Sequence, residues 1–278
     1  MKRRAFLPLL TYPDSIPEAV AANAAALAAQ LEASLDVLVV DVDIPPVSNV
    51  LSRILLDTPH LIRQTEASSH KRGVELLAAV RAAADQAGVS VAHINKSAAP
   101  ALLGDVAAIQ ARYYDLAIIG WEAGNETVKM LAESVIFGSG RPTILLPQNV
   151  PSKIFEHVAV AWDGGRVAAR AVADAEPVLE KAAKVSVLTV TDEKPLLEAD
   201  ASERLAEGLR AKGLPAQAVA IRAEDCAIGV TLQDHAIQQG ASLLVMGGYG
   251  HSRMRDFVLG GATRGIIDDL RLPVLISH

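Results

Sequence analysis

Short apolar segments alternate with longer segments of helical spacing along the whole chain. A short apolar run closed by Gly or Pro is typical of a buried strand, and apolar residues at positions i, i+3 and i+4 over a longer stretch indicate a helix. In the second half, this pattern predicts strands at 156–162, 185–190, 216–221, 242–246 and 273–276. The helices predicted between them lie at 167–184, 197–212, 226–239 and 257–270.

The first half repeats the same order of elements. Its predicted strands lie at 5–10, 35–40, 89–94, 116–119 and 142–146. Its predicted helices lie at 15–33, 61–86, 102–113 and 127–137. The closing phrases also match, because RPTILL at 141–146 is similar to LPVLIS at 272–277. A repeat of this length indicates a duplicated domain rather than a solenoid unit. We therefore expect two domains, at residues 1–149 and 150–278.

Strands that alternate with helices predict a parallel sheet with right-handed crossovers in each half. The predicted fold class is thus α/β, with two tandem doubly wound domains. In such folds, ligands bind beyond the carboxyl ends of the strands, where the strand order reverses. The residues that follow each strand are therefore the candidates for function.

A glycine motif follows the fourth strand of the second half. Gly247 and Gly250 are separated by two residues, and nine further residues lead to Gly260 and Gly261. The first pair allows a sharp turn and a close approach of the backbone to a ligand. The second pair lies at or just before a predicted helix, whose free N–H groups and dipole attract an anion. The spacing differs from both the Walker A loop and G-x-G-x-x-G.

With this motif, the second half resembles a universal stress protein domain. The nucleotide-binding members carry G-x2-G-x9-G-[S/T] here, an Asp after the first strand, which Asp163 matches, and an L-P-V-L-I ending, which 272–276 matches. The whole chain resembles a tandem universal stress protein. The resemblance implies an adenine-nucleotide alpha-hydrolase-like fold, a five-stranded parallel sheet in each domain and ATP between the first and fourth strands. The implied ligand-binding residues are Ala161, Trp162, Asp163, Thr189, Val190, Met246, Gly247, Gly250, His251, Arg253, Gly260, Gly261, Ala262 and Thr263.

Some of these residues also have plainer interpretations. Gly261 stands where the family has Ser or Thr, so a phosphate would lose a hydroxyl partner, which Thr263 could replace. Asp163 could be a helix N-cap, a role that is compatible with ligand binding. The glycines could be turn residues, and the cations of the loop could simply be solvated. Cys226 lies beside Glu224 and Asp225, which favours a structural thiol over a reactive one.

The first half has lost the glycine motif. Gly120 is followed by Trp121 and Glu122, and alignment of the closing strands places Lys129 near the position of Gly260. No glycine pair opens the following helix, and Glu122 and Glu126 would repel a phosphate. We expect this domain to stabilise the second one or to present a partner surface.

Composition and charge argue against several classes of function and of site. The net charge of −6 argues against a nucleic-acid surface. A single Cys among 278 residues excludes a disulfide framework and makes the cytoplasm the expected compartment. No segment is typical of a signal peptide or a membrane helix. The His residues show no metal-ligand spacing.

The resulting expectation is an ATP-binding protein of the stress response that acts by binding rather than by rapid turnover. Mg²⁺ would accompany ATP, held mostly by phosphates and water. The family resemblance also implies that the two domains pair as an internal pseudo-dimer, and a further homodimer is possible. Two alternatives stay open: a slow ATPase, and a nucleotide-free scaffold that binds a protein or a small metabolite.

Overall fold

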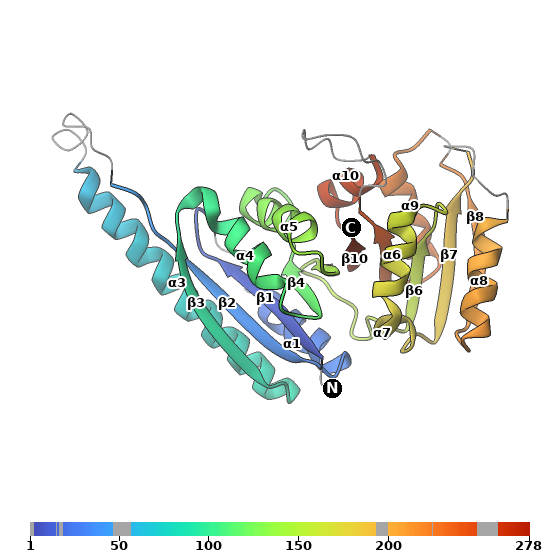
Figure 1. Ribbon diagram of the computed structural model, residues 1–278, viewed down its shortest axis with the longest axis horizontal. Coiled ribbons are helices and arrows are strands. Elements are labelled where there is room, and N and C mark those ends of the chain that lie inside the picture. The colour runs from blue at the N-terminus through green and yellow to red at the C-terminus, as the bar shows by residue number, and fades with distance from the viewer. Residues whose placement is uncertain are drawn as a thin grey trace. The chain divides into compact units, whose positions relative to one another are not determined.

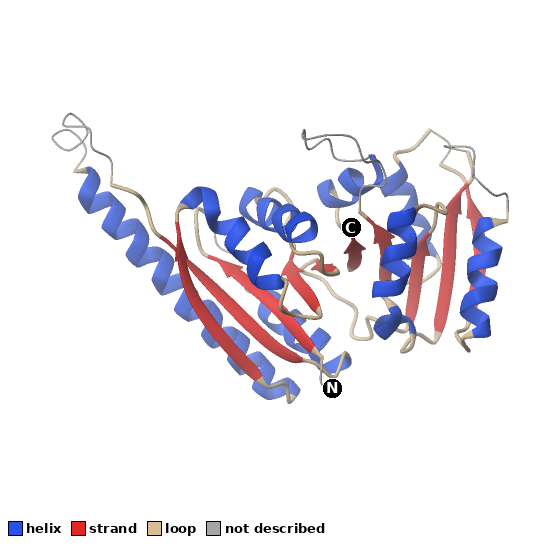
Figure 2. Cartoon of the chain, viewed as in Figure 1, coloured by secondary structure: helices blue, strands red, loops and turns tan. Residues whose placement is uncertain are grey.

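The computed structural model describes residues 3–14, 16, 19–46, 57–192, 200–223, 225–248 and 261–278. The chain divides into two compact units, Met1–Ser139 and Gly140–His278. The division falls before the fifth predicted strand, whereas the sequence suggested a boundary at 149/150. Each unit is described by itself below, and Figures 1 and 2 show the elements of both.

The first unit is a parallel sheet between two layers of helices. Its strands are β1 (Arg4–Leu10), β2 (Ser34–Val42), β3 (Val91–Ala98) and β4 (Leu116–Gly120). Its helices are α1 (Ala19–Gln30), α3 (Thr58–Ala87), the short 3-10 helix η1 (Pro100–Leu102), α4 (Leu103–Ala111) and α5 (Glu126–Gly138). In this unit the strand order is β3-β2-β1-β4, and the paired strands are parallel. Helices α1 and α3 pack together on one face, and α4 and α5 on the other (Figure 1).

The second unit repeats this plan. Its strands are β5 (Thr143–Leu146), β6 (His157–Ala161), β7 (Lys184–Val190), β8 (Ala216–Ile221), β9 (Leu243–Gly247) and β10 (Val274–Ser277). Its helices are α6 (Arg166–Asp174), α7 (Glu176–Leu179), α8 (Ala201–Ala211), α9 (Ile228–Gln238) and α10 (Gly261–Asp268). The strand order is β5-β10-β9-β6-β7-β8. Strands β6 to β10 are buried along most of their length, apart from the edge strand β8.

One strand departs from the predicted all-parallel sheets. β5, expected to close the sheet of the first half, pairs antiparallel with β10, with Ile144 beside Leu275. The two strands have similar sequences, but in this antiparallel pairing only the central pair, Ile144 and Leu275, brings equivalent positions together. The fold class is confirmed as α/β with a mostly parallel sheet, and the strand direction at this edge is corrected.

The helices differ from the predicted ranges mainly at their ends. The predicted helix at 167–184 is two helices, α6 and α7, which meet at Ala175. Pro177 explains the break, because proline has no N–H to donate and is tolerated only in the first turn of a helix. The helix predicted to open at Cys226 begins at Ile228, so that Cys226 lies in the preceding turn. No helix within the described ranges has the length and apolar character needed to cross a membrane.

Candidate functional site

The strand order of the second unit reverses between β6 and β9. The chain runs from β6 to β7 and β8 on one side, and then returns to place β9 on the other side of β6. Crevices at such reversals, beyond the carboxyl ends of the strands, are the usual ligand sites of doubly wound sheets. Val160 lies beside Val245, so Ala161 and Met246 are the next residues along the two strands at this edge.

The residues after β6 are held by internal hydrogen bonds. The Trp162 indole Nε1 donates to the Ala201 carbonyl at 3.1 Å, which fastens the ring to the start of α8. The buried Thr189 hydroxyl donates to the Trp162 carbonyl at 2.8 Å. The Asp163 carboxylate accepts from the Gly165 N–H at 2.8 Å, and Gly165 is the N-cap of α6. Asp163 thus shapes the turn before the helix, although Gly165 and not Asp163 is the cap.

Gly247 has a packing role at the end of β9. A Cβ built there would lie 2.5 Å from the Val167 carbonyl carbon and 2.6 Å from the Ala168 nitrogen, so the start of α6 crosses the strand end. The neighbouring Met246 side chain is buried, and the Gly248 N–H donates to the Ser277 carbonyl at 2.7 Å. This glycine is therefore required by the fold, whatever ligand lies nearby.

The next described residue of the glycine motif is Gly261, at the start of α10. Gly261 is the first residue of the helix and is exposed, and a Cβ built on it would meet nothing within 4 Å. Thr263 is buried in the first turn, which contains no acidic residue. Four predicted ligand residues lie outside the described residues: Gly250, His251, Arg253 and Gly260.

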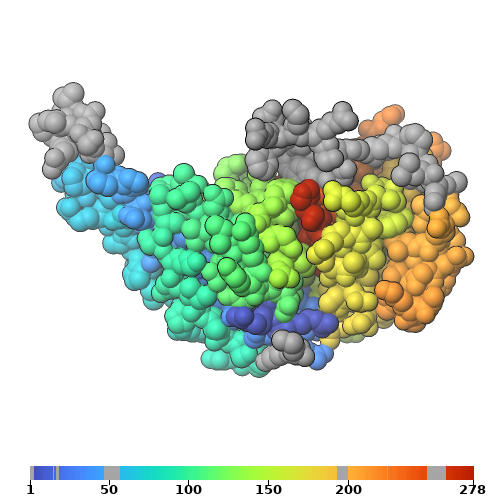
Figure 3. All heavy atoms as spheres, in the orientation of Figure 1, coloured from blue at the N-terminus to red at the C-terminus, as the bar shows by residue number. Residues whose placement is uncertain are grey.

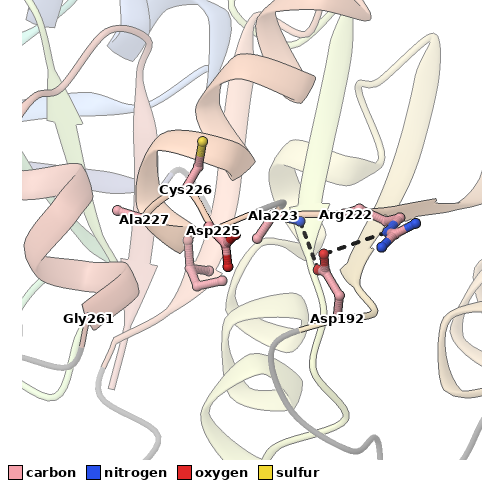
Figure 4. A pocket seen from close by; sticks show the side chains of 8 residues that line it. Asp192, Arg222, Ala223, Asp225, Cys226, Ala227 and Gly261 are labelled. Atoms are coloured by element: carbon pink, nitrogen blue, oxygen red, sulfur yellow. Dashed lines mark hydrogen bonds and ion pairs between the residues drawn. The ribbon is translucent and has the colours of Figure 1, made fainter.

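A hollow of about 600 Å³ opens beyond the carboxyl ends of β7 and β8 (Figure 4). Its lining residues are Asp192, Arg222, Ala223, Asp225, Cys226, Ala227, Ile228 and Gly261. The Asp192 carboxylate accepts from the Ala223 N–H at 2.8 Å and lies 3.7 Å from the Arg222 guanidinium. Cys226 is exposed, and its sulfur points away from Asp192 in Figure 4. Gly261 belongs both to the lining of this hollow and to the predicted glycine motif.

Sequence reasoning missed Asp192 and Arg222. Of the predicted residues, only Gly261 lines the hollow, while Ala161, Trp162, Asp163, Thr189 and Val190 gather at the ends of β6 and β7. The available signal was position, since Asp192 follows strand β7 by two residues and Arg222 follows strand β8 directly. Acidic residues at the end of the second strand also contact ribose in dinucleotide-binding folds.

The equivalent edge of the first unit is occupied by helix α3. The Thr11 and Ser69 hydroxyls lie 2.6 Å apart, and the Ser69 oxygen also accepts from the Val42 N–H at 3.1 Å. The Arg72 guanidinium donates to the Thr11 carbonyl at 3.1 Å. One Asp41 oxygen lies 2.8 Å from the His70 ring. These contacts bind side chains of α3 to the carboxyl ends of β1 and β2.

The helix that corresponds to α10 also begins differently. The Asn125 side chain caps α5 by accepting from the Val128 N–H at 3.1 Å, and its amide donates to Glu122 at 3.0 Å. Glu126 adds a carboxylate to the first turn. An N–H that a phosphate would require is therefore bonded to a side chain.

The clearest pKa shifts on the strands lie at the opposite, amino-terminal edge of the sheets. A hydrogen bond from Arg4, which opens β1, to Asp36 at 2.7 Å raises the pKa of the Arg4 guanidinium. Burial lowers the pKa of His157, which opens β6, and the nearby Lys184 charge adds to this effect. The His157 Nε2 lies 2.9 Å from the Ser186 hydroxyl. These groups are structural rather than part of the candidate site.

Comparison with models of protein families finds a match in the second unit. Residues 155–278 match the model of the Universal stress protein family. This match covers most of the C-terminal unit, which is therefore similar to a universal stress protein domain. A comparison with curated proteins finds no match for the chain.

Solved structures also share the fold of the whole chain. A universal stress protein from Archaeoglobus fulgidus DSM 4304 superposes with a TM-score of 0.74 at 16% identity, covering 100% of this chain and 99% of its own. A functionally unknown protein from Pseudomonas aeruginosa PAO1 gives a TM-score of 0.56 at 16% identity, covering 99% of this chain and 92% of its own. The likeness over the full length is consistent with a tandem of two universal stress protein folds.

Proposed function

We propose that the C-terminal unit, Gly140–His278, binds an adenine nucleotide, ATP, and that the protein acts in the stress response by binding rather than by rapid turnover. One observation carries this proposal: an open hollow at the carboxyl edge reaches Gly261, the first residue of α10. The N–H groups of a helix start attract phosphate, and the first turn of α10 has no carboxylate to repel it.

The hollow also borders the start of α9. Its N-cap, Ala227, makes no side-chain hydrogen bond to the helix, and the first turn of α9 contains no acidic residue. Asp192 and Asp225 lie in the same lining and offer hydrogen-bond acceptors. An elongated ligand with phosphates at one end and hydroxyl or amine donors at the other matches this arrangement. Among the described residues, no group of three or more His, Cys, Asp or Glu side chains could hold a metal ion. Mg²⁺ would bind with ATP, through phosphates and water.

A nucleotide-free scaffold is the second candidate. It is favoured by the internal partners of the predicted ligand residues, since Thr189 donates to Trp162, Asp163 accepts from Gly165 and Gly247 abuts α6. In this case the hollow would take a small metabolite, or the surface around it a protein.

Two glycine substitutions, G261E and G208E, distinguish ATP binding from the nucleotide-free scaffold. Replacement of Gly261 with Glu adds a carboxylate at the α10 start, where the structure leaves room for a side chain. We expect G261E to weaken ATP binding at least about tenfold, because the carboxylate repels the phosphates, which carry the same sign of charge, and competes with them for the N–H groups of the helix start. The control is G208E, since Gly208 in α8 also has nothing within 4 Å of a built Cβ. Calorimetric titration with MgATP and mass spectrometry of the ligand released from purified protein are the measurements. Equal affinity in the two variants would contradict placement of the phosphates at α10. No bound nucleotide and no heat at millimolar ATP would favour the scaffold.

A further inference from the structure

The hollow beside β7 and β8 has two chemically different ends (Figure 4). Gly261 and Ala227 lie at one end, where α10 and α9 begin, and Asp192 and Arg222 lie at the other, just after β7 and β8. The volume of about 600 Å³ is within the usual range for small-molecule sites. A ligand that fills the hollow meets helix N-termini at one end and a carboxylate at the other.

The two helix starts lie at the same end because α9 and α10 are in backbone contact. A Cβ built on Gly229, in the first turn of α9, would lie 2.6 Å from the Ala262 carbonyl oxygen of α10. In the first unit, a Cβ at Gly104 would instead meet side chains of α5, those of Met130 and Ser134. Neither α9 nor α10 has an acidic residue in its first turn. This end of the hollow therefore favours phosphate groups.

The Asp192 carboxylate is held at the opposite end. One of its oxygens accepts from the Ala223 N–H at 2.8 Å, and the other lies 3.7 Å from the Arg222 Nε. The Asp192 side chain is 25% exposed, so it is fixed in place and still accessible from the hollow. A carboxylate accepts about four hydrogen bonds, so the contact with Ala223 leaves capacity for a ligand.

The first unit has no acceptor at the equivalent position. Alignment of β2 with β7, by their pairing with β1 and β6, places Val42 at the position of Asp192. Val42 is buried and pairs with Ala98, so the ladder between β2 and β3 continues through this point. In the second unit the ladder ends before Asp192, and its carboxylate bonds to the next strand in place of a backbone group. The carboxylate is therefore a feature of the second unit and not of the repeated fold.

The chemistry of a carboxylate indicates which part of a nucleotide it binds. An ionised carboxylate only accepts hydrogen bonds. Adenine presents its amine beside a ring nitrogen that is itself an acceptor, so a carboxylate placed there faces a like group. Ribose presents two adjacent hydroxyls, and both can donate. Acidic residues at strand ends bind ribose hydroxyls in dinucleotide-binding folds as well. Ribose is thus the better match.

We propose that Asp192 is a specificity-determining residue that binds the ribose hydroxyls, so that the hollow selects ribonucleotides over nucleotides that lack these groups. This inference rests on the proposed binding of ATP by the second unit. The phosphates lie at the starts of α9 and α10, and the ribose lies at the ends of β7 and β8. Asp192 both ends the ladder, through Ala223, and recognises the sugar.

Calorimetric titration of the full chain with MgATP and with the magnesium complex of 2′,3′-dideoxy-ATP tests this role. The two ligands share base and phosphates and differ only in the two hydroxyls. The wild type should bind the dideoxy compound at least about tenfold more weakly, because a hydrogen bond to a charged acceptor is lost. In D192N the side-chain oxygen can still accept from the Ala223 N–H, but the amide group cannot accept from a hydroxyl. D192N should therefore bind the two ligands with nearly equal affinity.

D225N and E207Q are the matched controls. Asp225 lines the same hollow, and Asn tolerates its positive φ of 68°. Glu207 is exposed on α8, the helix that forms the orange part of the surface in Figure 3. Each variant removes one negative charge, as D192N does, and each should keep the wild-type preference for ATP over the dideoxy compound.

The ratio of the two affinities separates recognition of the sugar from a structural role, which would change both affinities alike. Equal affinities in the wild type, or an unchanged ratio in D192N, would overturn the role of Asp192 while ATP binding stands. A wild type that binds neither ligand would contradict the proposed function itself, and the role of Asp192 with it. The wild-type comparison needs no substitution, so it decides the point even if D192N does not fold.

Discussion

Strands β4 and β9 end in the same way in the two units, but the helices that follow them, α5 and α10, begin differently. A Cβ on Gly120, the last residue of β4, would lie 2.4 Å from Val20 of α1. A Cβ on Gly247, the last residue of β9, would lie 2.5 Å from Val167 of α6. The strand-end glycine therefore belongs to the shared fold, because it allows the first helix to cross the strand end in both units.

The differences lie where a phosphate would bind. Helix α5 begins with the Asn125 cap and Glu126, whereas α10 begins with Gly261 and has no acidic residue in its first turn. Helix α3 bonds to the ends of β1 and β2 through Ser69 and Arg72. In the second unit, Trp162 and Thr189 at the equivalent strand ends bond to each other. Features that both units keep are explained by folding, so features found only in the second are the better guide to function.

The largest effect is expected from adding a methyl group to Gly247. G247A forces a Cβ against backbone atoms of α6, which cannot move without displacing the helix. We expect a loss of about 3 kcal/mol in the free energy of unfolding, at the upper end for overpacking.

The equivalent substitution in the first unit, G120A, should reduce the free energy of unfolding by less, about 1–2 kcal/mol. The reason is that the added Cβ would contact mainly the side chain of Val20 and not backbone atoms.

Urea denaturation of the intact chain measures both variants. G208A is the control, because its added methyl group meets nothing within 4 Å and alanine favours a helix interior by roughly 0.5–1 kcal/mol. A G247A variant as stable as G208A would mean that this glycine is not needed for packing. The glycine would then be left with a ligand role alone.

A smaller effect is expected where α3 meets β1 and β2. S69A removes the buried hydroxyl that lies beside the Thr11 hydroxyl and accepts from the Val42 N–H. A buried group that loses its partner costs about 1–2 kcal/mol, which thermal or urea unfolding would resolve. S97A, at an exposed position of β3, is the control and should change stability little. An S69A variant with wild-type stability would show that α3 is not fixed there by this contact.

The smallest expected effect is a pH dependence of stability. It arises at the amino-terminal edge of the sheet in the second unit and not at that edge in the first unit. Arg4 bonds to Asp36 in the first unit, and His157 to Ser186 in the second, at matching positions of the strands. The pKa of buried His157 is lowered from 6.5, so the unfolded chain binds a proton that the folded chain resists. Stability is therefore retained above about pH 6.5 and falls as the pH decreases from there towards the lowered pKa.

The midpoint of urea denaturation at several pH values measures this dependence. H157Q should reduce the loss of stability below pH 6.5, whereas H60Q, at an exposed position of α3, should leave it unchanged. If H157Q and the wild type lose stability in parallel, burial of His157 is not the source of the acid sensitivity.

The apolar pattern predicted most of the strands and helices, because each of them is formed by residues that are neighbours in the sequence. β8 matches the predicted range 216–221, and β4 extends the predicted strand by one residue, to Gly120. The break at Ala175 was missed although Pro177 signals it, since the Ala-rich pattern continues across it. The antiparallel direction of β5 was missed because the pattern of apolar residues does not encode the direction of a strand.

The candidate site was less predictable because it depends on contacts between distant residues. Ser69 lies 58 positions from Thr11, and no local pattern connects them. No pattern in the sequence singles out Asp192, whose carboxylate accepts from the Ala223 N–H, 31 positions away. The motif did direct attention to Gly261, which lines the hollow. For Gly247 the motif suggested a ligand role, whereas its close contact with α6 also gives a packing reason.

The stoichiometry of ATP binding tests the central claim most directly. Calorimetric titration of the intact chain with MgATP should give one site per chain, located in the second unit and lost in G261E. Two sites per chain would contradict the inference that Asn125, Glu126 and the contacts of α3 close the first unit to nucleotide. No binding at millimolar ATP would contradict the nucleotide site itself.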